Sequence, residues 1–105
     1  YITTIKQDVC VEVPSVATEA GIVPIRQITL PEHLAVMVNN SAMIEDLAVK
    51  AAIEGDPDKV FHAILFDPLT SAVCSMEEIR QMVQEMFDKN AEYLGYFKSL
   101  KINAS

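Results

Sequence analysis

The sequence predicts an α+β fold in which two short strands are followed by three or four helices. Alternating and β-branched residues dominate the first 30 positions, whereas from about residue 34 apolar residues recur every three or four positions. The chain has 105 residues and half of them are hydrophobic, which allows one modest core but not two ordinary domains.

The first strand is predicted in "QDVCVEVP", residues 7–14. Val9, Val11 and Val13 alternate with less apolar side chains, as expected of a half-buried strand. Pro14 ends this run because proline cannot donate to a strand ladder.

A second strand is predicted in "IVPIRQITL", residues 22–30, which is rich in β-branched side chains. Pro24 places it at a sheet edge or in an irregular pairing. The intervening "SVATEAG", residues 15–21, is predicted to be a turn-rich link that ends at Gly21. The two runs therefore form a hairpin or two edge segments.

The first helix is predicted to begin near "TLPE". Thr29 is a possible N-cap, Glu32 follows three residues later, and Pro31 falls in the first turn. The weak helix formers "NNSA" at 39–42 leave two possibilities, one long bent helix or two shorter helices. The expected apolar face consists of Leu34, Val38, Ile44, Leu47, Ala48 and Ala51.

A second helix is predicted after "EGDPDK". Gly55 suits the position that follows a helix end, and Asp56 before Pro57 suits an N-cap. Pro68 stops this helix because it disfavours helical geometry at the residue before it. Its buried face is expected to be Val60, Phe61, Ile64 and Leu65.

The last helix is predicted to begin at a capping box formed by Ser75 and Glu78. The five methionines are expected mostly on buried helical faces, and the tail "KSLKINAS", residues 98–105, is expected to fray. The predicted apolar stripe consists of Ile79, Met82, Val83, Met86, Phe87 and Leu94.

Composition narrows the class of protein. The net charge is −7 and the eight Lys and Arg residues are scattered, so nucleic acid is not an expected partner. No apolar run reaches the ~20 residues that cross a bilayer, and no leader is recognised. Only two cysteines occur, which favours reduced thiols and a cytoplasmic location. The start at Tyr1 indicates a piece of a longer protein.

Four side chains were weighed as candidate ligands or nucleophiles. His33 and His62 have no second ligand at metal-binding spacing, so each is interpreted as an ordinary helix histidine. Cys74 has no base near it in "TSAVCSM", although a following helix N-terminus would lower the pKa of its thiol. Cys74 is interpreted as small buried filler, and no role is assigned to Cys10.

Acidic pairs are also explained by helix starts and solvated faces, where the helix dipole favours them. These pairs are Glu45 with Asp46, Asp56 with Asp58, and Glu77 with Glu78. Glycine-rich nucleotide loops and a G-x-S-x-G elbow are absent from the sequence. The prediction is therefore that this chain contributes no catalytic, cofactor-binding or metal-binding residue.

Several short landmarks in register resemble the C-terminal end of the bacterial glycoside hydrolase family 4 enzymes. They are "VEVP" at 11–14, "LP" at 30–31, "EGD" at 54–56, "DPLT" at 67–70 and "EI" at 78–79. The resemblance covers nearly the whole chain apart from its first few residues and its tail. The segment "DPLTSAV" is more similar to the branch that acts on unphosphorylated α-galactosides, α-glucosides or α-galacturonides than to the 6-phosphoglycosidase branch.

The resemblance implies an unusual glycosidase that uses NAD and a divalent metal, typically manganese. Such enzymes oxidise the sugar at C3, remove the C2 proton, eliminate the leaving group, add water and return the hydride, outside the usual two-carboxylate scheme. It also implies that the nucleotide loop, the metal ligands and the catalytic residues lie upstream. None of these roles is transferred to Cys10, Cys74, His33 or His62.

The resemblance further implies that residues 1–105 are a single partial domain, the C-terminal fragment of a substrate-side domain. That domain would resemble the C-terminal fold of lactate and malate dehydrogenases. It would pack on the nucleotide-binding domain, within a homo-oligomer, and the isolated piece would be inactive and prone to self-association. "LFDPLTSAVCSMEEI", residues 65–79, would be an architectural joint. The alternatives are a stand-alone helical interaction module and a piece of a 2-hydroxyacid dehydrogenase.

Overall fold

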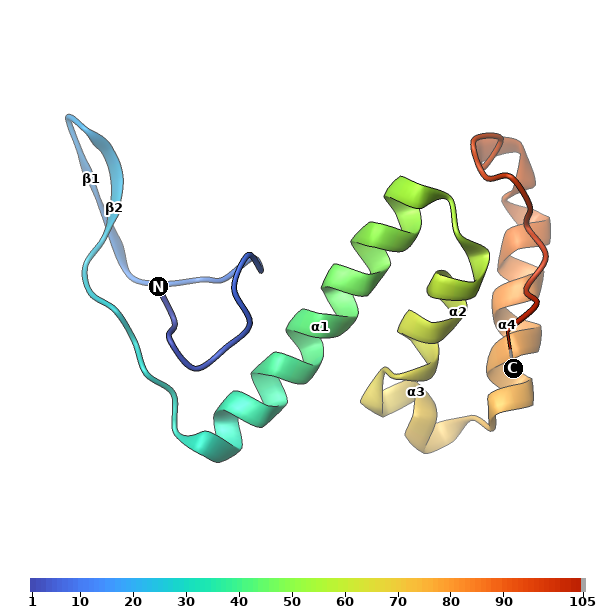
Figure 1. The fold of residues 1–105 in the computed structure, drawn as a ribbon, viewed down its shortest axis with the longest axis horizontal. Helices are drawn as coiled ribbons and strands as arrows, with labels where there is room; N and C mark the ends of the chain where they lie inside the picture. The colour runs from blue at the N-terminus through green and yellow to red at the C-terminus, as the bar shows by residue number, and fades with distance from the viewer. Residues whose placement is uncertain (105) are drawn as a thin grey trace. The chain divides into compact units, whose positions relative to one another are not determined.

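The computed structural model describes residues 1–104, which fall into two compact units, residues 1–43 and residues from 44 onward (Figure 1). Two antiparallel strands precede four α-helices, which confirms the predicted α+β class. The fourth helix is followed by a short 3₁₀ turn, η1, at Ala91–Tyr93. The likeness to dehydrogenase C-terminal domains stays a prediction.

The hairpin lies at a different place from the one predicted. β1 is Ser15–Thr18 and β2 is Gly21–Pro24, with Thr18 opposite Gly21. The predicted strand at 7–14 is therefore wrong, and the predicted link at 15–21 instead supplies β1 and the turn. The second predicted strand is confirmed only over its first residues.

Local turn chemistry explains this shift. Gly21 has a φ of +107°, a backbone conformation that suits glycine and closes a tight turn. The Thr18 hydroxyl also donates to the Gly21 carbonyl at 3.0 Å. The pairing ends at Pro14, whose carbonyl accepts from the Ile25 N–H. Beyond this hairpin, the first unit contains one isolated parallel bridge, between Ile2 and Ile28.

The first helix, α1, runs without interruption through Glu32–Glu54, so the alternative of two helices is excluded. Asn39, in the "NNSA" patch, uses its side chain to hold the N-terminal segment. Its amide donates to the Thr4 carbonyl at 3.0 Å and accepts from the Lys6 N–H at 2.7 Å. Asn39, a residue type that is unfavourable inside a helix, thus makes a tertiary contact here.

The predicted Thr29 cap is wrong. The first hydrogen bonds of the helix are donated by the Leu34 and Ala35 N–H groups to the Pro31 carbonyl. The Thr29 hydroxyl instead pairs with the Thr3 hydroxyl at 3.0 Å. The apolar face is confirmed in part. Ala51 is buried and Ile44 and Leu47 are half-buried, but Leu34, Val38 and Ala48 are exposed.

The turn between α1 and α2 confirms the predicted roles of Gly55 after the end of α1 and of Asp56 as an N-cap. Gly55 has a φ of +65°, and the Asp56 N–H donates to the Ala51 carbonyl at 3.0 Å, as in a Schellman turn. Asp56 caps α2, Pro57–Leu65, by accepting from the backbone N–H groups of Asp58 and Lys59. The chain also approaches closely at Phe97, where a Cβ on residue 55 would make a tight contact with the Phe97 Cα at 3.2 Å.

Gly55→Ala is expected to lower the free energy of unfolding by about 1–2 kcal/mol, because an L-residue is strained at positive φ. The added Cβ would also lie 3.2 Å from the Phe97 Cα. Gly95→Ala is the matched control, because its Cβ would meet no atom within 4 Å. Urea unfolding of the two variants checks this, and an equal effect at both positions would contradict it.

The stretch at 65–79 contains a helix that the sequence reading did not assign. Asp67 caps the short α3, Pro68–Val73, by accepting from the Thr70 N–H and hydroxyl. The helix at the predicted capping box, α4, spans Met76–Lys89, and both bonds of the box are present. The proline that ends α2 therefore also begins α3.

The core of the second unit lies between α2, α4 and the returning tail. The predicted inward face of α2 is confirmed, since Phe61 is fully buried and Val60, Ile64 and Leu65 pack against the same cluster. The buried members of the cluster are Phe61, Ile79, Val83, Phe87 and Ile102. Leu94 lies beyond α4 but packs on it from the chain that follows.

Two expectations about this unit are wrong. All five methionines are exposed, with accessible fractions between 41% and 67%. For Met82 and Met86 the reason is that the buried stripe of α4 is narrower than predicted and contains only Ile79, Val83 and Phe87. The tail is not frayed up to residue 104, because Ile102 is 7% exposed and joins the core. Ser105, the last residue of that predicted segment, lies outside the described residues.

Candidate functional site

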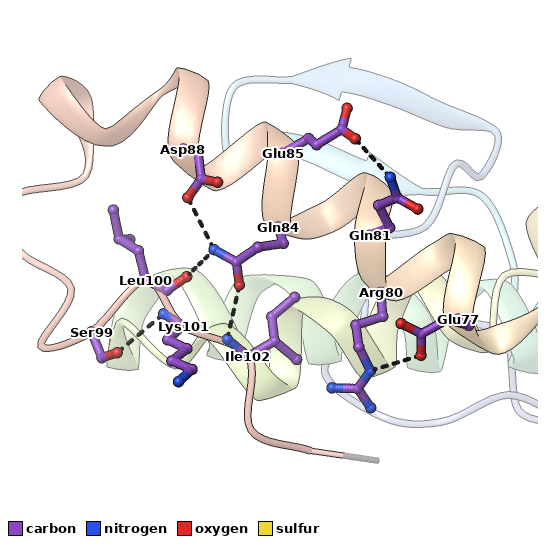
Figure 2. A pocket seen from close by; sticks show the side chains of 10 residues that line it. All are labelled: Glu77, Arg80, Gln81, Gln84, Glu85, Asp88, Ser99, Leu100, Lys101 and Ile102. Carbon is purple, nitrogen blue, oxygen red and sulfur yellow. Dashed lines mark hydrogen bonds and ion pairs between the residues drawn. The ribbon is translucent and has the colours of Figure 1, made fainter.

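A hollow of about 820 Å³, lined mostly by polar and charged residues, lies between α4 and the tail, within the second unit (Figure 2). Side chains from α4 form one wall and residues 99–102 form the other. Leu100 and Ile102 contribute the apolar part of the lining. The tail is attached to the helix along this hollow. We refer to the contacts between α4 and residues 99–102 as the seam.

Gln84 is the central contact of this seam. Its Nε2 donates to the Leu100 carbonyl at 3.0 Å, and its Oε1 accepts from the Ile102 N–H at 3.2 Å. Nε2 also donates to the Asp88 carboxylate at 3.1 Å, which orients the amide (Figure 2). One side chain thus satisfies two backbone groups of an extended segment, as a neighbouring strand would.

Asp58, near the start of α2, holds the end of the tail. Its Oδ1 accepts from the Asn103 N–H at 2.7 Å and from the Ala104 N–H at 3.0 Å. The hydrogen bond from Ala104 lowers the pKa of Asp58 below its usual range, and the bond from Asn103 acts in the same direction against the opposing effect of burial. Coulomb interactions with His62 and Arg80 also lower the pKa of Asp58.

Arg80 connects the hollow with the core. Its guanidinium lies 4.9 Å from the centre of the Phe61 ring, a favourable cation–π arrangement. Its Nε lies 3.6 Å from a carboxylate oxygen of Glu77, which is largely exposed. Because such surface ion pairs contribute little, the main role of Arg80 is to cover the Phe61 ring.

Asp58→Asn is expected to lower the free energy of unfolding at pH 7 by about 1–2 kcal/mol, because a partly buried charged acceptor is lost. The folded pKa of Asp58 is below the unfolded one. Its contribution is therefore present above the unfolded pKa of about 3.9 and disappears as the pH falls through the folded value. The variant should lose stability less steeply below about pH 5.

Urea unfolding measured across that pH range, together with hydrogen exchange at Asn103 and Ala104, checks this expectation. Glu85→Gln is the matched control, because Glu85 is exposed and accepts only from the neighbouring Gln81 side chain. A parallel pH dependence for the Asp58 variant and the unmodified chain would contradict the assigned role.

The structure separates the candidate ligands weighed from the sequence. Cys10 and His33 are exposed in the first unit. Cys74 and His62 are partly buried in the second, and Cys74 packs on the core as the filler interpretation expects. The His62 ring lies 5.5 Å from that of Phe61. Within residues 1–104 no three His, Cys, Asp or Glu side chains are grouped so as to hold a metal ion.

The acidic pairs have the structural roles that the sequence suggested. Asp56 caps α2 and Glu78 closes the capping box of α4. The Ser75 N–H holds the pKa of Glu78 below its ordinary value. Asp46 pairs with Lys50 at 2.8 Å. The holding role of Asp58 was not anticipated, because its partners lie 45 and 46 residues away.

Gln84 and Ile102 were also missed by the sequence reading, although the tail carried a signal. Leu100, Ile102 and Ala104 are apolar at every second position, a period typical of an extended segment with one buried face. All three pack against the core. The short length of this run and its polar neighbours concealed the pattern.

The structure describes an α+β chain in which helices begin at side-chain caps and the tail packs back on α4. Comparison with known proteins identifies its family. Residues 1–70 match the family described as "Family 4 glycosyl hydrolase C-terminal domain". The chain therefore belongs to glycosyl hydrolase family 4, as the resemblance indicated. No solved structure matches it.

Curated relatives agree with this assignment. The chain is 40% identical over 93 residues to an alpha-galactosidase of Rhizobium meliloti (strain 1021), covering 89% of this chain and 19% of the relative. It is 31% identical over 97 residues to an alpha-galactosidase of Bacillus subtilis (strain 168), covering 92% and 22%. An alpha-galacturonidase of Thermoanaerobacter italicus (strain DSM 9252 / Ab9) is 30% identical over 84 residues, covering 80% and 18%. The chain thus spans about a fifth of the length of these relatives.

Proposed function

We propose that this chain is the C-terminal structural portion of the substrate-side domain of an α-glycosidase, one that acts on α-galactosides or related α-glycosides. The observation that carries the proposal is the match of residues 1–70 to the family 4 C-terminal domain, with two alpha-galactosidases among the relatives. The role of the chain is to supply packed helices rather than reacting groups.

NAD and Mn²⁺ are proposed cofactors of the intact enzyme. The residues of this chain do not fit either group. The ligand set is missing within residues 1–104, and the sequence has no glycine-rich dinucleotide loop. Both groups are therefore proposed to bind the portion of the enzyme outside residues 1–105. When bound, they supply hydride transfer and polarisation of a carbonyl group.

A cytoplasmic location is proposed from the cysteines, and assembly is proposed from the exposed apolar side chains. Cys10 and Cys74 are both free thiols, which supports a reducing, cytoplasmic setting. No helix within residues 1–104 is long and apolar enough to cross a membrane. The many exposed apolar side chains support assembly with the rest of the enzyme, in a homo-oligomer.

The test is an assay of the intact enzyme on p-nitrophenyl α-galactoside with NAD, Mn²⁺ and a thiol reductant. Release of nitrophenol that requires both NAD and Mn²⁺ is the expected result. Oxidation of malate or lactate without glycoside cleavage would replace the proposal with the 2-hydroxyacid dehydrogenase alternative. A native polypeptide of 105 residues that is folded and monodisperse would instead support the stand-alone helical interaction module.

A further inference from the structure

A second hollow, of about 680 Å³, lies beside α2 and has a more apolar lining than the hollow at the seam. It is contained in the second unit and is mainly apolar. It is lined by Leu47, His62, Leu65, Phe66, Ser71 and Met76. We refer to these six residues as the α2–α3 groove.

The groove exposes side chains that are normally covered. Phe66 is 62% exposed and Met76 is 51% exposed, although both lie beside the well-packed α2 and α4. α3, which contributes Ser71, has no buried residue at all. Contiguous apolar surface of this kind marks an interaction site.

The end of α2 supports the same conclusion. Phe61 and Ile64 pack toward the core cluster, whereas Leu65 packs on the core and also lines the groove, together with the C-cap residue Phe66. Leu47 of α1 lines the same hollow, but Phe66 stays largely exposed within residues 1–104.

Two occupants could cover the groove, a second copy of the chain or another part of the same polypeptide. The chain carries a net charge of −7, so bringing two copies together meets electrostatic repulsion. The matched relatives are about five times as long as their aligned segment, which leaves ample polypeptide outside residues 1–105. The length of that polypeptide favours the second occupant.

We infer that the α2–α3 groove is the seat of an apolar segment from the same polypeptide, outside residues 1–105. This inference rests on the proposed function, because it requires the chain to be part of the longer enzyme. The groove would bury large aliphatic or aromatic side chains from that segment, with Phe66 and Met76 as the central contacts. His62 and Ser71 are the polar groups available to hydrogen-bond its backbone.

The test replaces Phe66 with p-benzoylphenylalanine, a photoreactive residue of similar shape, in the intact enzyme. The expected product is a cross-link within one chain, which keeps the monomer mass. Peptide mass spectrometry should place its other end outside residues 1–105. Met76→p-benzoylphenylalanine provides a second position if the first probe disturbs docking. The same probe at Lys89, an exposed polar position on α4, is the control and should give a several-fold lower yield.

Each result decides the inference. A product of doubled mass would assign the groove to a second copy and overturn it. Yields at residues 66 and 76 that equal the control at residue 89 would show that the groove stays open, and this also overturns it. Because cross-linking does not depend on turnover, a failed glycosidase assay combined with the expected cross-link would reject the proposed activity and retain the docking surface.

Discussion

Phe61→Ala is expected to lower the free energy of unfolding of the chain by about 3–5 kcal/mol. The Phe61 side chain is fully buried and belongs to the cluster formed with Ile79, Val83 and Phe87. Its removal leaves a cavity beneath α4 and also removes the ring on which Arg80 lies. Because natural domains are stable by only about 5–15 kcal/mol, much of the cooperative structure should be lost.

Urea unfolding followed by far-ultraviolet circular dichroism measures this effect. Phe66→Ala is the matched control, since it removes the same side chain from an exposed position five residues away. Its expected effect is within about 0.5 kcal/mol. Similar losses for the two variants would show that the assignment of the core to the α4 side of α2 is wrong.

Ile102→Ala is expected to lower the free energy of unfolding by about 2–5 kcal/mol, an effect typical of a core residue, although it lies only three positions before residue 105. The side chain is held in the cluster by the Gln84 bond to its own N–H. The adjacent Lys101→Ala, at an exposed position, is the control. If the tail were frayed, both substitutions would be neutral, and that result would contradict the seam.

Local rules predicted where α1 ends and where α2 and α4 begin. Gly55, Asp56 and the Ser75–Glu78 capping box fix helix boundaries through contacts within a few residues, which a single sequence reveals. Register and tertiary contacts were harder to predict. The hairpin was misplaced because Val9, Val11 and Val13 gave a stronger alternation than the stretch that forms β1.

The exposed methionines illustrate a different limit. Apolar residues at helical spacing show which face of a helix should be buried. They do not show whether the residues that bury it lie in the same stretch of chain. Met82 and Met86 therefore share the predicted stripe with Ile79 and Val83, yet they remain exposed. The seam was missed for a related reason, since Asp58 and Gln84 act on a tail that is distant in sequence.

The packing around Phe61 has a consequence for how this part of family 4 enzymes can be divided. The family match ends at residue 70, within α3, whereas four of the five buried cluster side chains lie beyond that point. A chimera or an expression clone joined at residue 70 would expose Phe61 to water. The smallest transplantable piece extends at least to Ala104, so the end of the family match and the end of the packed core do not coincide.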